Sequence, residues 1–342
     1  MIIEKQHITK LPLAYAVQFF HLPDGLYAVA ASEGEAGCLF FRVDRPKENE
    51  VVWENFGGTM SISKIEENGG FLAVRNFFKG FNSKTAKIVR AKRIGGGKWE
   101  VSDFLQLPYI HRFDVIPVGN ARFIVASTLC DDKDFKEDWS RPGRVWLGKL
   151  SDDGSCKLET FINGITKNHG FFNGFHNGKP IILITGQEGI FEIPLPDSDK
   201  APWTYRKIFE GEVSEAIFTD LDGDGRDELV TIDPFHGNRI SIYKELSDGF
   251  EMVYSMPANF AHVIWGGNIL GKPSLLVAYR EDNAPLLLLR KKPGDGWYLD
   301  HQIIDEHIGP TNISVESGEN ECVILCAAGK SQEIFMYRLR NG

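Results

Sequence analysis

Three histidines and a glutamate stand at matching places in a pattern that repeats along this chain of 342 residues. His111, His169, Glu215 and His262 each come near the start of a predicted strand, at intervals of 46 to 58 residues. Neutral imidazoles with a carboxylate suit Zn²⁺, Mn²⁺ or Fe²⁺, and three protein ligands leave a position for water or substrate. The sequence therefore predicts a divalent transition metal, such as Zn²⁺ or Mn²⁺, where these side chains meet. The alternative is a polar wall on which some of the nine histidines align by chance.

A second group of acidic residues lies within residues 220–229. Carboxylates at its first, third and fifth positions, a glycine at the sixth and an acid at the ninth can wrap oxygen ligands around Ca²⁺. The predicted ligands are the side chains of Asp220, Asp222, Asp224 and Glu228 and the backbone carbonyl of Arg226. Asp227 is expected to lie outside the ligand set. The alternative is a turn that forms without metal.

The elements that must position these residues are short apolar strands that recur seven times. Short apolar runs bounded by turns are typical of buried strands. The seven runs are 26–30, 72–74, 123–126, 181–184, 229–232, 275–278 and 323–325. A repeat of roughly 40–50 residues matches the length of a propeller blade. A pair of β-sandwiches is the alternative.

Outer strands containing aromatic residues follow six of these runs, at 51–53, 99–101, 158–161, 203–205, 250–254 and 297–299. The seventh unit stops at 337–340 without one, and residues 2–8 have the pattern of the missing strand. A propeller closed by its N-terminal strand removes the exposed sheet edges. We therefore predict an all-β, seven-bladed β-propeller as a single domain, 1–342. Its blades are expected at about 11–57, 58–107, 108–164, 165–211, 212–257, 258–305, and 306–342 with 2–9.

First strands line the channel of a propeller, so one residue of each should face the axis. The predicted ring consists of Tyr15, Ser61, His111, His169, Glu215, His262 and Asn312. Loops between second and third strands should surround the same mouth, and the calcium loop should lie on the opposite face. Those loops carry Lys79, Trp139, Arg141 and Arg280, which suit a small polyhydroxylated or anionic ligand. The alternative is that these loops are simply solvated.

The acidic loop resembles the FG-GAP or VCBS-type repeat of integrin-like propellers. The histidines, the loop and the segment 234–237 together resemble the propeller of the aldos-2-ulose dehydratases (1,5-anhydrofructose dehydratases). That resemblance covers the propeller only, because those enzymes are larger. It implies a lyase or isomerase acting on a keto-sugar, with His111, His169 and His262 as metal ligands. It further implies Glu215 as a fourth ligand or base, and His236 or Tyr15 as an acid/base.

Composition narrows the possible partners. A formal net charge of −9 argues against nucleic acid and against an anionic membrane surface. No apolar stretch reaches the length of a membrane span, no secretion signal is visible, and the five cysteines form no C-x-x-C pair. The cytoplasm is the expected location and a carbohydrate-like small molecule the expected ligand.

Two other functions remain open from the sequence. A non-catalytic module that binds a glycan or a protein is the main alternative to an enzyme, and fold alone does not decide between them. A hydrolytic lactonase is weaker, because the ring is richer in imidazole than in carboxylate. There is no G-x-S-x-G nucleophile motif and no nucleotide-binding glycine loop.

Overall fold

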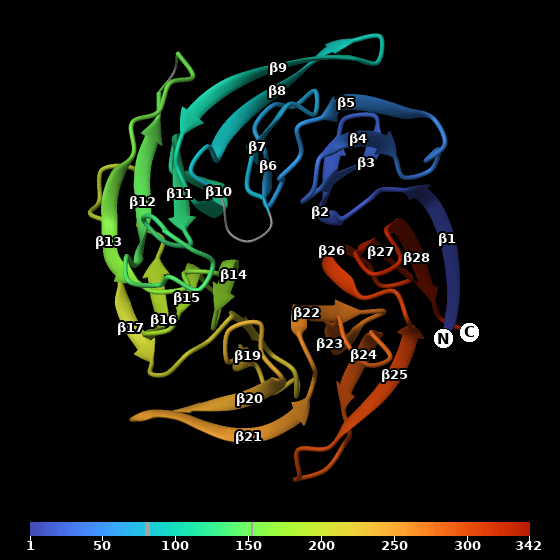
Figure 1. The fold of residues 1–342 in the computed structure, drawn as a ribbon. Coiled ribbons are helices and arrows are strands. Elements are labelled where there is room, and N and C mark those ends of the chain that lie inside the picture. Colours follow the sequence, from blue (N-terminus) through green and yellow to red (C-terminus); the bar gives the residue numbers. More distant parts are fainter. Residues whose placement is uncertain (79–82, 152) are drawn as a thin grey trace.

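The computed structural model describes residues 1–78, 83–151 and 153–342. It contains seven four-stranded antiparallel sheets arranged in a ring around an open centre, as Figure 1 shows. The described residues form no helix, and so none that could cross a membrane. The predicted all-β, seven-bladed propeller is confirmed.

Each blade runs outward from the axis, and consecutive strands pair with each other in six of the seven blades. The first three blades are β2 (Ala14–Leu22), β3 (Gly25–Ser32), β4 (Ala36–Arg42) and β5 (Asn49–Asn55); β6 (Ile62–Lys64), β7 (Phe71–Arg75), β8 (Lys87–Gly95) and β9 (Lys98–Gln106); and β10 (Ile110–Val118), β11 (Ala121–Thr128), β12 (Gly143–Leu150) and β13 (Glu159–Ile165). The next three are β14 (Phe171–His176), β15 (Lys179–Gly186), β16 (Gly189–Pro194) and β17 (Arg206–Phe209); β18 (Glu215–Thr219), β19 (Glu228–Asp233), β20 (Arg239–Leu246) and β21 (Gly249–Pro257); and β22 (Ala261–Ile269), β23 (Lys272–Tyr279), β24 (Leu286–Lys291) and β25 (Leu299–Asp305).

The seventh blade joins the two ends of the chain. It consists of β26 (Pro310–Ser317), β27 (Glu321–Ala328), β28 (Glu333–Arg340) and, outermost, β1 (Ile2–Lys10). β1 is antiparallel to β28, with Ile2 opposite Arg340 and Lys10 opposite Glu333. This pairing covers the edge that β28 would otherwise expose, which confirms the predicted closure.

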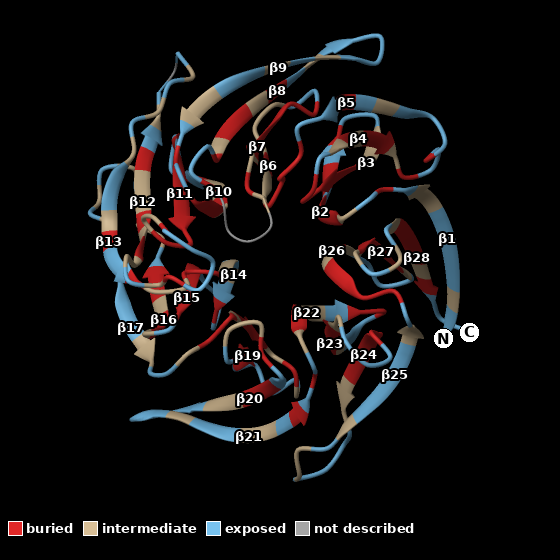
Figure 2. Ribbon diagram, in the orientation of Figure 1, coloured by how far each residue is buried: buried red, intermediate tan, exposed pale blue. Residues whose placement is uncertain are grey.

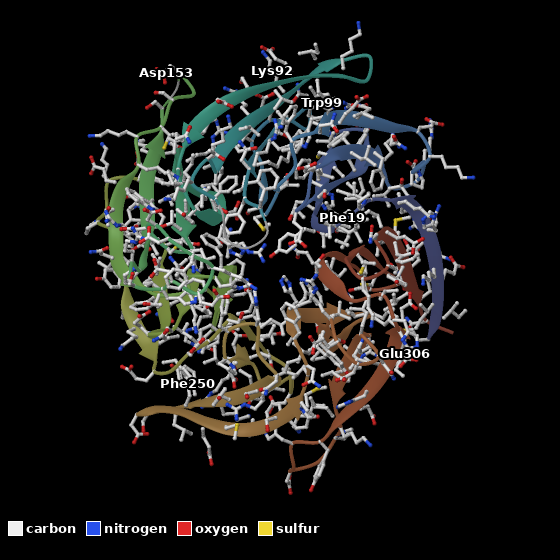
Figure 3. The ribbon with its side chains drawn as sticks, viewed as in Figure 1. Phe19, Lys92, Trp99, Asp153, Phe250 and Glu306 are labelled. Carbon is white, nitrogen blue, oxygen red and sulfur yellow. The ribbon has the colours of Figure 1, made fainter. Side chains whose placement is uncertain are left out.

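The outer strands were predicted less accurately than the inner ones. In blade four the fourth strand is β17, which begins at Arg206, so the expected strand at 203–205 is wrong. In blade six β25 begins at Leu299, and only this residue of the expected 297–299 is extended. Outer strands are largely exposed (Figure 2), so burial imposes little pattern on their sequences. Trp99 on β9 and Phe250 on β21 mark this layer in Figure 3.

The core lies within and between the blades. The second strands are buried almost throughout, and in β15 Ile181, Ile182, Leu183 and Ile184 are each at most 2% exposed. Both faces of an inner strand pack against neighbouring blades, so its sequence is continuously apolar rather than alternating. The largest apolar cluster joins blades one, two and three and includes Phe20, Phe71 and Phe113. The blades therefore form a rigid wall around the channel.

Candidate functional site

β-Bulges at the inner ends of the first strands direct side chains toward the axis. The pairing register skips one residue at Tyr15 in β2, at His111 in β10 and at His262 in β22. A bulged residue leaves the ladder, and its side chain is re-aimed. In β26 the skipped residue is Thr311, so the predicted ring member Asn312 lies one position further along its strand.

Three histidines meet closely enough to share one ion. The ligand atoms of His169, His236 and His262 all lie within 4.8 Å of one another. His169 and His262 are buried, and His236 is partly so. His111 is outside this triplet, although its ring centroid is 4.5 Å from that of His169. The structure thus brings together two of the three predicted ligands, and His236, predicted as an acid/base, takes the place of His111.

His236 reaches the axis from the loop between β19 and β20. Its backbone adopts a positive φ of 49°, which is uncommon for a residue other than glycine. Its backbone N–H donates to Ser214 Oγ at 3.2 Å, and its ring stacks on Phe235 at 4.1 Å between centroids. A Cβ at Gly237 would lie 2.3 Å from the carbonyl oxygen of Asp233, so this tight turn requires glycine. The loop therefore holds the imidazole in one orientation.

Backbone carbonyls of the following blade orient two of the imidazoles. Nδ1 of His111 lies 3.2 Å from the carbonyl oxygen of His169, and Nδ1 of His169 lies 3.2 Å from that of Ser214. An Nδ1–H that donates to a carbonyl leaves the lone pair on Nε2. Glu215 Oε1 is also 3.1 Å from Nδ1 of His169, but it has no hydrogen-bond partner in the described part of the chain.

Burial keeps the imidazoles of His111, His236 and His262 neutral. It lowers the pKa of His236 to about 2, assisted by the nearby His169 and Arg280. It also holds the pKa values of His111 and His262 well below the usual range, helped by neighbouring histidines and arginines. Nδ1 of His262 is buried and has no hydrogen-bond partner in the described part of the chain. Neutral imidazoles, one with an unsatisfied nitrogen, fit a divalent metal ion.

Arg112, Glu215 and Tyr15 form a buried polar layer beside the histidines. Arg112 donates from Nη1 to the carbonyl oxygen of Met60 at 3.0 Å and from Nη2 to the Tyr15 hydroxyl at 3.3 Å. Its Nη2 is 3.6 Å from Glu215 Oε1, and the Tyr15 ring meets His262 edge-on at 5.5 Å. Burial raises the pKa of Tyr15 to about 12, so this phenol remains protonated at neutral pH. Sequence analysis missed Arg112, although it follows the bulged His111 directly.

The four predicted loop residues differ in their surroundings. Arg141 is paired within its own loop with Asp132, Asp134 and Asp138, and it therefore braces that loop. Trp139 packs edge-on against Phe235 at 5.6 Å, which supports the histidine loop from behind.

The other two loop predictions concern Arg280 and Lys79. The guanidinium carbon of Arg280 lies 5.0 Å from the Phe260 ring centroid, and its charge lowers the pKa of His262. Lys79 lies outside the described residues.

The acidic loop brings its first three carboxylates together. Ligand atoms of Asp220, Asp222 and Asp224 lie within 4.8 Å of one another. Asp220 accepts from the backbone N–H groups of Gly223 and Gly225, at 2.8 and 3.0 Å. Glu228 is 1% exposed, and burial raises its pKa to about 7. The geometry suits a hard cation.

The side chain of Lys244, on β20, lies against this loop. Its Nζ is 2.7 Å from Asp222 Oδ2, 3.0 Å from Asp224 Oδ2 and 3.6 Å from Glu228 Oε1. The hydrogen bond with Asp222 contributes most to raising the pKa of Lys244. Nothing in the loop sequence predicted this contact, because Lys244 is 16 residues beyond Glu228. An incoming cation must therefore displace an ammonium group.

Asp227 turns away from the other carboxylates of the loop. Its backbone N–H donates to Asn177 Oδ1 at 2.9 Å, and its carboxylate accepts from the backbone N–H of Asn177. Asn177 belongs to the turn between β14 and β15, so the acidic loop is fastened to blade four.

Comparison with known proteins identifies the fold. No model of a known protein family matches the chain, and no functionally curated protein matches its sequence. A chain of the mitotic checkpoint complex is 8% identical with a TM-score of 0.61, and the match covers 99% of this chain and 94% of that chain. The β-propeller domain of Myceliophteria thermophila Cps50 (Swd1) is 10% identical with a TM-score of 0.57, and the match covers 100% of both chains. A candidate 6-phosphogluconolactonase of Bacteroides uniformis is 11% identical with a TM-score of 0.55, and the match covers 94% of this chain and 90% of that chain. At these identities the likeness concerns the fold alone. The chain is a seven-bladed β-propeller.

Proposed function

We propose that this protein is a metal-dependent enzyme that carries out lyase or isomerase chemistry, of the dehydratase type, on a keto-sugar or sugar derivative. The observation that carries the proposal is the triplet His169, His236 and His262, whose ligand atoms lie within 4.8 Å of one another. Packing alone does not require three histidine side chains on a channel axis. The resemblance to the aldos-2-ulose dehydratase propellers implies the same chemistry, although it implied His111 rather than His236 as the third ligand.

The three histidines would hold Zn²⁺ or Mn²⁺, and a fourth position would stay open. Such an ion polarises a carbonyl oxygen and makes the adjacent C–H bond more acidic. Glu215, within 3.1 Å of His169, is the carboxylate available to accept that proton. Tyr15, a neutral phenol next to His262, is available to donate a proton to the departing or developing hydroxyl oxygen.

A Ca²⁺ ion in the loop of Asp220, Asp222, Asp224 and Glu228, with the Arg226 carbonyl, is the second metal we propose. Because Asp227 binds Asn177, this loop fastens blade five to blade four. Its role is therefore structural.

Metal analysis of purified protein tests the enzyme proposal. We expect one transition metal per chain, lost in the variants His169→Ala and His236→Ala. His21→Ala is the matched control, because His21 is 70% exposed and pairs with Glu316. Circular dichroism checks that each variant is folded. A wild-type protein that binds neither Zn²⁺ nor Mn²⁺, even when both are supplied, would contradict the proposal and favour a glycan- or protein-binding module.

Proton exchange tests the chemistry. With a 2-keto-sugar in D₂O, the metal-loaded enzyme should exchange the hydrogen next to the carbonyl, followed by NMR, and Glu215→Gln should not. Hydrolysis of a sugar lactone is the second reaction to assay. The imidazole-rich ring is unlike the carboxylate-rich calcium site of a lactonase, but three imidazoles around a transition metal are also a ligand set for metal-activated water. The neighbours from Bacteroides that are described as candidate 6-phosphogluconolactonases suggest the substrate.

A further inference from the structure

The central channel continues beyond the histidines as a chamber of about 620 Å³. Its polar lining includes Gln18, Ser61, Asn173, Asn312 and the indole of Trp265. A Cβ at Gly267 would lie 2.8 Å from the Trp265 ring, so glycine there lets the indole lie along β22. An aromatic ring among amides and hydroxyls is a typical lining for a small polar ligand.

A smaller cavity of about 160 Å³ adjoins this chamber and reaches His262. It is lined by His262 and Glu215 and shares Arg112, Trp265 and Asn312 with the chamber. A molecule in the chamber would therefore be next to the open side of His262, whose Nδ1 has no described partner.

The chamber lies on the face of the calcium loop. Asn173 precedes the β14–β15 turn, and Asn177 of that turn binds Asp227 of the loop. Gln18 and Asn173 are exposed although they line the chamber, so solvent reaches it from this side. The loops predicted to surround a ligand mouth, with Trp139 and Arg280, belong to the opposite face.

The charged groups that line the chamber are already bonded within the protein. Arg112 contacts Glu215, and Asp114 accepts from Ser63 at 2.6 Å and from Asn173 at 2.8 Å. Lys64 donates to the carbonyl oxygen of His21 at 2.6 Å. An anionic ligand would find Arg112 and Lys64 already bonded and would meet the carboxylate of Asp114, whereas the hydroxyl groups of a neutral ligand can bond to amides and hydroxyls.

We propose that this chamber binds a neutral polyhydroxylated molecule the size of a mono- or disaccharide. We propose further that it is the entry route to the histidines, from the calcium-loop face. The entry route rests on the proposed function, whereas binding in the chamber does not.

Saturation-transfer NMR and calorimetry with D-fructose and D-glucose test the binding. We expect both sugars to bind, D-gluconate and glucose 6-phosphate to bind less well, and Trp265→Ala or Asn312→Leu to weaken binding about tenfold. Trp265→Phe should keep much of the affinity, because it preserves an aromatic face and the local packing. Arg280→Gln, on the opposite face, is the matched control and should bind as the wild type does.

The outcomes separate the two proposals. Three results would overturn the chamber proposal, whatever the metal content of the protein. They are loss of sugar binding in Arg280→Gln but not in Asn312→Leu, tighter binding of the charged sugars than of the neutral ones, and no binding of either neutral sugar. A wild-type protein that binds sugar but takes up neither Zn²⁺ nor Mn²⁺ when both are supplied would instead overturn the enzyme proposal alone. His236→Ala should lose the metal and still bind sugar, because His236 does not line the chamber.

Discussion

Replacement of Lys244 by methionine tests how the acidic loop is neutralised. The ammonium group lies within 3.6 Å of three carboxylates, on Asp222, Asp224 and Glu228. Methionine keeps an apolar stem in a place where the Lys244 side chain packs near Trp297, and it removes only the charge. Without calcium, the variant is left with acidic groups that have lost their nearest cation.

The size of the effect follows from burial. Breaking a fully buried ion pair costs about 3–5 kcal/mol, but exposed pairs are worth about 1 kcal/mol or less. Asp222 is 11% exposed and Lys244 is 32% exposed, so we expect about 2 kcal/mol, between these limits. An entropy of unfolding of about 2.1 cal/mol/K per residue converts this to a decrease in Tm of about 3 °C.

Thermal unfolding in chelator measures how much the Lys244 ammonium group stabilises the acidic loop, and thermal unfolding in millimolar calcium measures how much Ca²⁺ stabilises it. In chelator, Lys244→Met should unfold about 3 °C below the wild type. In calcium it should gain more than the wild type gains, because no ammonium has to be displaced. Lys291→Met is the matched control, since Lys291 approaches the same indole but bonds a backbone carbonyl. Equal melting temperatures in chelator, or equal gains from calcium, would refute this reasoning.

Three further predictions concern other parts of the ring. Burial opposes protonation of His176, but its hydrogen bond to Glu192 and the charges of Glu192 and Glu245 outweigh this and raise its pKa above about 6.5. The pairing therefore stabilises the fold below about pH 6.5, and this stabilisation is lost as the pH rises through the folded-state pKa. In denaturant titrations, His176→Asn should lower the free energy of unfolding by about 1 kcal/mol at pH 6 and by less at pH 8.5. A loss of stability that is independent of pH would contradict this prediction. Arg112→Met removes the guanidinium group that faces Glu215 and should lower the free energy of unfolding by about 3 kcal/mol in the same titrations. The double variant Arg112→Met/Glu215→Gln should recover stability, and no recovery would exclude the ion pair as the cause. Deletion of β1 exposes the edge of β28 and should cause association detectable by light scattering, and a monomeric, equally stable deletion variant would show that closure is unimportant.

The propeller was predictable because its signals are local. Each second strand, such as 181–184 in β15, is buried on both faces and is therefore a continuous apolar run that can be counted. The closing strand was predictable for a related reason, since one blade lacked an outer strand and residues 2–8 supplied the pattern. The exposed strand β17 was misplaced, because packing constrains few of its residues.

The candidate metal site was only partly predictable. His262 lies on the first strand of its blade and His169 lies two residues before one, and both follow the repeat, so alignment found them. His236 comes from a loop, outside the repeat, and reaches the axis through a left-handed residue and a glycine turn. No alignment of strands could assign it to the same group.

The sequence by itself determined the number of blades and the acidic loop, because each depends on residues close together in the chain. It also determined the closure of the ring, because one blade lacked an outer strand that residues 2–8 could supply. The tertiary structure alone decided which imidazoles share a centre, that Lys244 faces the acidic loop and that the channel widens on the calcium-loop face. These features depend on where bulges and loops direct side chains from separate blades. In β26 the bulge falls on Thr311, whose hydroxyl donates to backbone carbonyls, and the next residue, Asn312, lines the chamber, so a shift of one residue decides which side chain faces the channel.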